Sequence, residues 1–244
     1  MRERRSRTAR DIRRRAYGQN FLASPALAAR LVRDAGVRPT DIVVDLGAGS
    51  GSLTAALATR ARAVVAVELD PMLAAALRRR FAGTTNVTVV EGDARRTPLP
   101  RQPFRVVASL PFNLTTVLLR RLLDPRLSLV RADVVLQWEV ARKRAHPSRT
   151  ALDASWAPWW DMRLGRRIAS DQFRPRPAVA AGVLVAERRA KPLLPEAAYP
   201  AYARFVKALF EGTLAREAET SQLARLFATY AAGTTPPAAP RRGS

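Results

Sequence analysis

Short apolar runs alternate with amphipathic segments between residues 42 and 137, and this alternation constrains the fold more than any other feature. Apolar runs without a polar face are typical of parallel strands that helices cover on both sides. The expected strands are Ile42–Leu46, Val64–Glu68, Val87–Glu91, Arg105–Ser109 and Asp133–Gln137, and the helices between them are Ser52–Arg60, Pro71–Phe81 and Leu114–Leu123. The sequence therefore predicts an α/β fold with a doubly wound, Rossmann-like parallel sheet.

The flanking segments predict further elements. A helix is expected from the Ser24-Pro25 cap to Gly36, because Ser and Pro favour the start of a helix and Gly its end. Two more strands are expected at Trp159–Ile168 and Ala180–Arg188, with no helix between them. Such strands pair antiparallel, so we expect a hairpin at one end of the sheet.

Composition divides the rest of the chain. Helical patterns at Glu196–Gly212 and Arg216–Ala232 follow a Pro-rich linker and predict a small C-terminal helical appendage. We expect a basic disordered arm over residues 1–16, a Rossmann-like domain over 17–190, a short helical domain over 191–232 and a disordered tail over 233–244.

The net charge is +22, from 42 Lys and Arg residues against 20 Asp and Glu residues. An imbalance of this size attracts a polyanion, and the planar fork of arginine suits phosphate oxygens. Nucleic acid is therefore the favoured partner, with an anionic membrane surface as the alternative. Residues 1–15 carry eight arginines and form either a phosphate-binding arm or a solvated tail.

The residue types that are missing exclude several kinds of chemistry. The chain has no cysteine, which excludes thiol nucleophiles, Cys-ligated zinc, iron–sulfur clusters and disulfides. His146 is the single histidine, so we expect no metal site, and a Ser-His-Asp hydrolase is a remote alternative. No apolar run approaches the roughly 20 residues of a membrane span, and the N-terminus lacks the apolar core of a secretory signal. We expect a cytoplasmic protein, with an Arg-rich transit peptide as the alternative.

A glycine-rich loop, Asp45–Gly51, ends the first strand and opens a helix. Glycines there let the backbone turn sharply and approach a ligand closely. The spacing Gly-x-Gly-x-Gly differs from the dinucleotide pattern, and no Gly-Lys-Ser/Thr follows, which excludes a P-loop. The loop is either a nucleotide-type site or a glycine-rich turn of some other α/β protein.

Two acidic residues end the next two strands. Glu68, at the tip of the second strand, is placed to accept hydrogen bonds from both ribose hydroxyls of an adenosine ligand. Asp93 follows the third strand and is placed to accept a hydrogen bond from the adenine amino group. Each alone could be a solvated strand end, but ligands of such sheets bind at these strand tips.

The fourth strand ends with Ser109-Leu110-Pro111-Phe112, which favours a methyl donor over a nicotinamide cofactor. The amino group of a base is a poor nucleophile because its lone pair is delocalised into the ring. Two acceptors for its N–H bonds, the Ser109 side chain and the Leu110 carbonyl, would turn the lone pair toward a methyl sulfonium. Pro111 would stiffen the turn and Phe112 would stack on a base taken out of its helix.

The chain resembles the rRNA adenine N6-methyltransferases, and within them the actinobacterial erythromycin-resistance (Erm) 23S rRNA methylases more than the small-subunit dimethylases. The similarity covers about residues 17–189, in family order. The matching segments are Gln19–Leu22, Asp45–Gly51, Val67–Asp70, Gly92–Ala94, Ser109–Asn113 and Phe173-x-Pro175-x-Pro177-x-Val179, and Leu136–Glu139 and Leu164–Arg167 carry the likeness to the Erm group.

The resemblance implies S-adenosylmethionine as the methyl donor. Asn20 and Leu22 would close over its methionine part, Gly47 and Gly49 would line it, Glu68 would hold the ribose, Asp93 the adenine, and Ser109 would face the donor from the acceptor side. It further implies N6-methylation of an adenine in 23S rRNA, which confers macrolide-type resistance. A 16S rRNA dimethylase of ribosome assembly and a weakly catalytic RNA-binding relative are the alternatives.

This sequence departs from the family at two places. The family usually has Asn at the position of Ser109, and a seryl oxygen reaches about one bond less far. The C-terminal region is also short for the family, and because this region usually helps to grip RNA, the resemblance implies looser substrate selection.

Other side chains are candidates for RNA contact. Tyr17 could stack on the target base or simply pack, and Arg142, Lys143 and Arg144 could meet phosphates or form a solvated helix face. The tryptophans near the expected hairpin could be a stacking platform, but aromatic residues at strand starts favour the core; they are Trp156, Trp159 and Trp160. We expect a monomer.

Overall fold

The computed structural model describes residues 20–146, 150–211 and 219–231. The predicted arm over 1–16, Tyr17 and the predicted tail over 233–244 lie outside the described residues. None of the described helices is long and apolar enough to cross a membrane.

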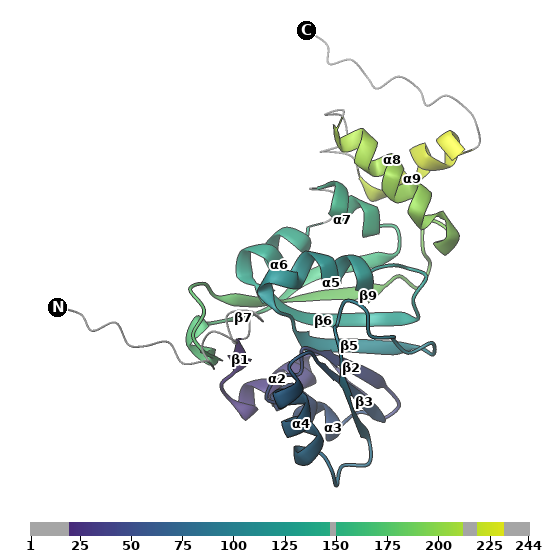
Figure 1. The fold of residues 1–244 in the computed structure, drawn as a ribbon. Coiled ribbons are helices and arrows are strands. Elements are labelled where there is room, and N and C mark those ends of the chain that lie inside the picture. Colours follow the sequence, from purple (N-terminus) through teal and green to yellow (C-terminus); the bar gives the residue numbers. More distant parts are fainter. Residues whose placement is uncertain (1–19, 147–149, 212–218, 232–244) are drawn as a thin grey trace, which may run out of the picture.

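The centre of the fold is a sheet of seven strands (Figure 1). They are β2 (Ile42–Leu46), β3 (Ala63–Glu68), β4 (Val87–Glu91), β5 (Phe104–Ser109), β6 (Leu129–Gln137), β7 (Trp160–Ile168) and β9 (Ala181–Arg188). Their order is β4-β3-β2-β5-β6-β9-β7; the strands from β4 to β6 are parallel, and β9 is antiparallel to β6 and β7. The predicted parallel sheet and antiparallel end hairpin are confirmed.

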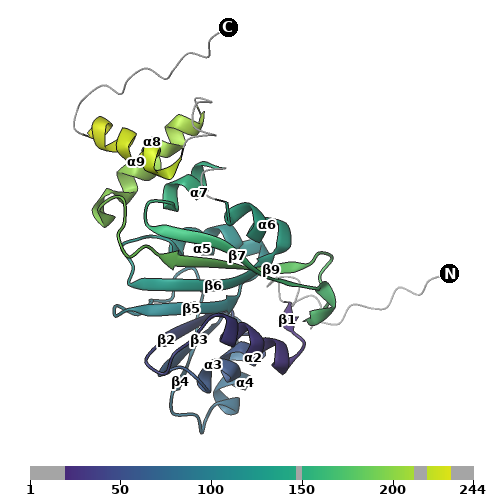
Figure 2. The ribbon, with the colours of Figure 1, turned by 180° about the vertical axis from the view of Figure 1, so that it is seen from behind.

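Helices cover both faces of this sheet (Figures 1 and 2). The helices are α2 (Pro25–Asp34), α3 (Ser52–Ala58) and α4 (Pro71–Arg80) on one face, and α5 (Thr115–Leu122) and α6 (Trp138–Arg144) on the other. Successive side chains of a strand point to opposite faces. Val106 of β5 accordingly packs in the core under α5, whereas Val107 packs in the core under α2 and α3.

The first of these helices has the predicted caps. The Ser24 hydroxyl accepts a hydrogen bond from the Leu27 N–H at 3.4 Å, and Pro25 occupies the first turn. Gly36 follows the helix with a positive φ of 63°, a conformation that glycine adopts without steric cost.

A second, two-stranded sheet joins distant parts of the chain and was not predicted. β1 (Phe21–Leu22) pairs antiparallel with β8 (Phe173–Arg174). The pairing makes the N-terminal motif and the Phe-x-Pro-x-Pro segment hydrogen-bonding partners. β1 also borders the site described below.

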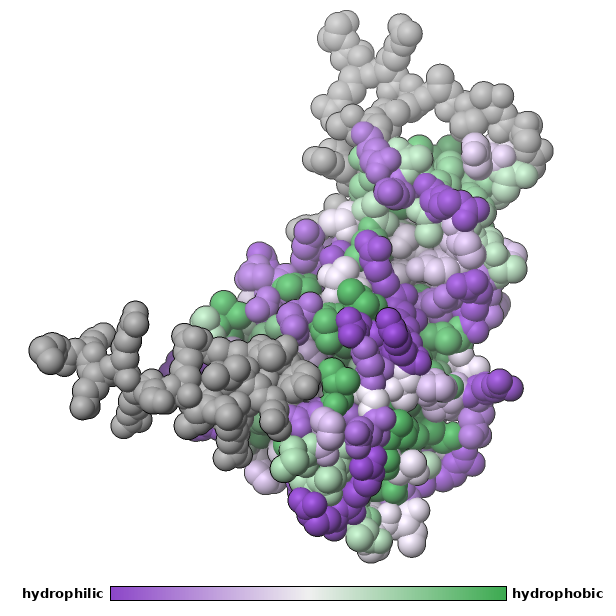
Figure 3. Space-filling view, in the orientation of Figure 1, coloured by the Kyte–Doolittle hydropathy of each residue, from purple (hydrophilic) through white to green (hydrophobic). Residues whose placement is uncertain are grey.

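The C-terminal helices share the core of the sheet. α7 (Ala151–Trp156), α8 (Tyr199–Glu211) and α9 (Thr220–Ala231) lie above α5 in the views of Figures 1 and 2. The three tryptophans are at most 1% exposed, which confirms a core position, and Trp159 meets the Tyr202 ring edge-on with centroids 5.6 Å apart. Figure 3 shows apolar side chains at the surface of these helices, where Tyr230 is 57% exposed. Short 3₁₀ turns lie at Phe112–Leu114, Ser170–Gln172 and Glu196–Ala198.

Candidate active site

A cavity of about 330 Å³ lies at the carboxyl ends of β2 to β5. Ligands of doubly wound sheets bind where the strand order reverses, and here the order reverses between β2 and β5. The volume falls in the range of about 300–1,000 Å³ that is usual for small-molecule sites. Seven of the predicted site residues line it: Asn20, Gly47, Glu68, Asp93, Ser109, Leu110 and Pro111.

The glycine loop brings two predicted motifs into contact. Gly47 and Gly49 have positive φ angles of 74° and 57°. A Cβ on Gly47 would lie 3.4 Å from the Pro111 ring, and one on Gly49 would lie 2.6 Å from the Phe21 ring. The Phe21 ring thus occupies the place that a side chain at position 49 would need, and both positive φ angles favour glycine, so the loop packs closely against Phe21 and Pro111.

Glu68 is buried at the tip of β3, with only 4% of its surface exposed. One carboxylate oxygen accepts the Gly49 N–H at 2.7 Å and the other accepts the Asp70 N–H at 2.9 Å. Burial raises the pKa of Glu68, although these backbone donors favour its charged form. The side chain is held in one orientation at the cavity wall, and each oxygen keeps a lone pair for a further donor.

Asp45 is a buried carboxyl that was not among the predicted site residues. It lies at 1% exposure in β2 and accepts a hydrogen bond from the Thr54 hydroxyl at 2.7 Å. Burial, together with the nearby charge of Glu68, raises the pKa of Asp45 to about 7. The signal was available, because Asp45 is an acidic residue inside an otherwise apolar strand.

This pKa predicts a pH-dependent stability. The folded pKa of about 7 exceeds the unfolded value of 3.8, so Asp45 favours folding in its protonated form, and its cost to stability grows as pH rises between these values. We expect Asp45→Asn to be more stable than the parent in thermal unfolding, with a larger gain at pH 8 than at pH 5. A gain that is the same at both pH values would show that Asp45 does not titrate in this window.

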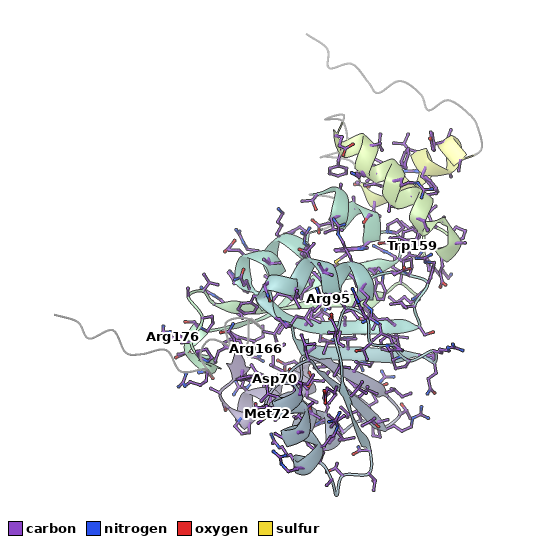
Figure 4. All side chains as sticks on the ribbon, in the orientation of Figure 1. Asp70, Met72, Arg95, Trp159, Arg166 and Arg176 are labelled. Atoms are coloured by element: carbon purple, nitrogen blue, oxygen red, sulfur yellow. The ribbon has the colours of Figure 1, made fainter. Side chains whose placement is uncertain are left out.

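Asp93, after β4, is held by a neighbour that was also not predicted. Arg95 donates to the Asp93 carboxylate through its Nε and Nη2 atoms, with a shortest distance of 2.6 Å. Hydrogen bonding to Arg95 lowers the pKa of Asp93 and keeps it ionised as an acceptor. Arg95 lies at the rim of the cavity (Figure 4).

The backbone of the same loop is held from the other side by Arg121 of α5. Its guanidinium donates to the carbonyl oxygens of Ala94 and Thr97. Partial burial lowers the pKa of Arg121. Because α5 follows the 3₁₀ turn that begins at Phe112, Arg121 connects the Ser109–Phe112 segment to the loop of Asp93.

The segment after β5 is only partly at the cavity. Leu110 is buried and donates its N–H to the Val135 carbonyl at 3.2 Å, which fixes the segment against β6. The Leu114 N–H donates to the Pro111 carbonyl at 2.9 Å and closes a 3₁₀ turn. Phe112 packs against the core under α2 and α3 and does not line the cavity, so its predicted stacking on a base stays a prediction.

The N-terminal motif closes one side of the site. Asn20 lines the main cavity, and Leu22 lines a smaller adjoining cavity of about 30 Å³ beside Asp45 and Ser109. No group of His, Asp and Glu suited to hold a metal ion is found in the described ranges of the chain.

The three basic residues predicted on α6 differ in their contacts. Arg142 pairs with Glu139 at 2.7 Å on the exposed face, and Lys143 is exposed. Arg144 pairs at 2.7 Å with Asp153, which is fully buried, and so joins α6 to α7. The structure gives Arg144 this internal partner, and phosphate contact by all three residues stays a prediction.

Comparison with known proteins supplies the family. The family model for ribosomal RNA adenine dimethylase matches residues 10–221. The chain is 40% identical over 201 residues to the mycinamicin-resistance protein MyrB of Micromonospora griseorubida, covering 82% of this chain and 63% of MyrB. It is 36% identical to an rRNA adenine N-6-methyltransferase of Corynebacterium diphtheriae, covering 81% of this chain and 77% of that protein.

A solved structure agrees with the sequence relatives. The 23S rRNA methyltransferase ErmE has a TM-score of 0.72 and 30% identity, over 90% of this chain and 92% of that one. The chain spans less than two thirds of the length of MyrB. By family model, sequence and fold, the chain belongs to the ribosomal RNA adenine dimethylase family.

Proposed function

We propose that the protein transfers a methyl group from S-adenosylmethionine to the N6 atom of an adenine in 23S rRNA, and that this confers macrolide-type resistance. The observation that carries the proposal is the junction of Gly47 with Pro111, which brings the donor loop against the segment of Ser109 and Leu110. The similarity to MyrB and ErmE favours 23S rRNA and resistance over the 16S alternative.

The residues at the cavity fit an adenosine-containing donor. The backbone at Gly47 lines the cavity without a side chain and leaves room for close contact with the donor, and the fixed Glu68 carboxylate accepts hydrogen bonds from two ribose hydroxyls. Asp93 accepts a hydrogen bond from the adenine amino group, and Asn20 and Leu22 cover the methionine part of the donor. When bound, this donor supplies a methyl group on a positively charged sulfonium.

The acceptor side has to make an amino lone pair available. The Ser109 hydroxyl and the Leu110 carbonyl each accept a hydrogen bond from one N–H group of the adenine amino group. This arrangement turns the nitrogen lone pair toward the methyl group. Pro111 and the 3₁₀ turn hold these acceptors in place. The contribution of the protein is therefore positioning, and no general base is assigned because the released proton can pass to water.

Arg121 provides a test of the adenine part of the site. Arg121→Met should release the loop of Asp93 and raise the dissociation constant for S-adenosylhomocysteine about five- to tenfold, because hydrogen bonds from a charged group are lost. S-inosylhomocysteine, which lacks the amino group, should change much less. Arg120→Met on the same helix is the matched control, and equal losses for both ligands would contradict a role in adenine recognition.

The charge of +22 supports RNA as the polyanionic partner. Arg142 and Lys143 are exposed on α6, and Tyr17 precedes the N-terminal motif. If arginines meet phosphates, the logarithm of RNA affinity falls linearly with the logarithm of salt concentration. We expect deletion of residues 1–15 to flatten this slope in filter-binding titrations. An unchanged slope and affinity would assign the arm no part in RNA binding.

Transfer of a labelled methyl group to purified rRNA tests the proposed substrate. We expect naked 23S rRNA to be labelled at adenine N6 and 16S rRNA to remain unlabelled. Labelling of 16S rRNA alone would favour the assembly enzyme, and donor binding without transfer to either RNA would favour the weakly catalytic relative. We further propose that the protein acts in the cytoplasm as a monomer.

A further inference from the structure

A second cavity of about 330 Å³ lies on the face of the sheet that α2 covers. Its floor consists of valines from three neighbouring strands, each at most 7% exposed: Val107, Val135, Val183 and Val185. It shares no lining residue with the main cavity, and only Leu53 with the small adjoining one. The two sites are therefore separate.

A bulge in β7 shapes the rim of this second cavity. Leu164 pairs with Leu184 and Arg167 pairs with Gly182, so Gly165 and Arg166 together oppose the single residue between those partners. A bulge adds one residue to a strand and changes the direction of its side chains. Gly165 and Arg166 both line the cavity.

The glycine at the bulge leaves the floor accessible. A Cβ at Gly165 would lie 3.1 Å from the Cβ of Val183, which is closer than ordinary van der Waals contact. A side chain at position 165 would therefore crowd the valine floor, whereas glycine keeps space above it.

One charged side chain at the rim has no partner. Arg166, labelled in Figure 4, pairs with Asp34 at 2.8 Å. Asp133 accepts two hydrogen bonds from Arg131, at 2.7 and 2.8 Å. Arg163, in the ladder between β7 and β9, is the remaining charged residue of the lining, and its exposed side chain has no ion pair or hydrogen bond within the described part of the chain. The free charge at the rim is therefore positive.

We propose that this cavity is a binding site for a small amphipathic organic anion. Its apolar body lies on the valine floor, and its carboxylate or sulfonate group binds the Arg163 guanidinium. An inorganic anion would leave the valine floor without a partner, and a neutral hydrocarbon would make no use of Arg163. The proposal does not depend on the methyl-transfer reaction, because the cavity lies outside the main site.

Fluorescent probes test this proposal with the full-length protein. 8-Anilinonaphthalene-1-sulfonate carries an aromatic body and one sulfonate, and N-phenyl-1-naphthylamine is its analogue without the charge. With S-adenosylhomocysteine present at saturation to fill the main site, we expect the sulfonate to bind with one-to-one stoichiometry and more tightly than the neutral analogue.

Variants of Arg163 locate the bound probe. Arg163→Gln should weaken binding of the sulfonate about fivefold, the ratio that corresponds to one exposed charge pair. Arg163→Glu should weaken it further, and Arg163→Lys should retain most of the affinity. None of these changes should affect the neutral probe, and Arg79→Gln, an exposed arginine on α4, is the matched control.

Two results would overturn the proposal. One is the absence of sulfonate binding to the parent protein when the main site is filled. The other is equal sulfonate affinity for the parent and Arg163→Glu, which would place the probe elsewhere, for example on the exposed apolar side chains of the C-terminal helices.

Discussion

Glu68→Ala is expected to weaken donor binding by about 2–3 kcal/mol, because hydrogen bonds to a charged group in a buried site are lost. The carboxylate is already oriented by the N–H groups of Gly49 and Asp70, so little has to be reorganised when the ribose binds. Its pKa is raised by burial, and donor affinity should therefore fall as pH decreases and Glu68 becomes protonated. Calorimetry with S-adenosylhomocysteine measures both effects.

The neighbouring strand offers a control for this variant. Glu91 ends β4 as Glu68 ends β3, and the two residues are paired across the strands. Glu91 is exposed and bound to Arg78 at 3.1 Å, and it does not line the cavity. Glu91→Ala should leave donor affinity unchanged. Unchanged affinity in Glu68→Ala as well would remove Glu68 from the ribose role.

Ser109→Ala is expected to slow methyl transfer about tenfold or more while leaving donor affinity almost unchanged. A lost transition-state acceptor commonly costs about 2.7–4 kcal/mol, and the short reach of serine reduces this value. Ser109→Asn should retain or raise the rate, because the amide oxygen extends farther from the same backbone position. Single-turnover transfer to a 23S rRNA fragment with saturating donor separates this step from binding.

An unchanged transfer rate would change the assignment of the acceptors. If Ser109→Ala transfers the methyl group as fast as the parent, the side chain is not an acceptor. The Leu110 carbonyl, held by the bond from its N–H to Val135, would then be the acceptor that remains.

The parts of the fold that repeat along the chain could be predicted from the sequence. Runs such as Ile42–Leu46 are buried on both faces, so their apolar composition and the helices between them determine the parallel sheet. The strand tips of such a sheet share one edge, which is why Gly47, Glu68, Asp93 and Ser109 could be expected to lie around one cavity.

Contacts between distant segments could not be predicted in this way. The pairing of β1 with β8 depends on where the chain returns after β7, and two-residue strands have no periodicity. Arg121 reaches Ala94 only because α5 packs beside the loop after β4. In the sequence, Arg144 belongs to a run of basic residues that favours an exposed position. Its partner Asp153 lies on the short helix α7, which was not predicted, so the ion pair could not be expected.

The central claim, methylation of a 23S rRNA adenine at N6, is tested most directly by mass mapping of modified adenines in rRNA from a host with and without this gene. We expect a gain of 14 mass units per methyl group at a single adenine of 23S rRNA, with 16S rRNA unchanged, and macrolide tolerance only in the host that carries the gene. A new methyl group confined to 16S rRNA, or identical maps from the two hosts when the protein is present, would contradict the account.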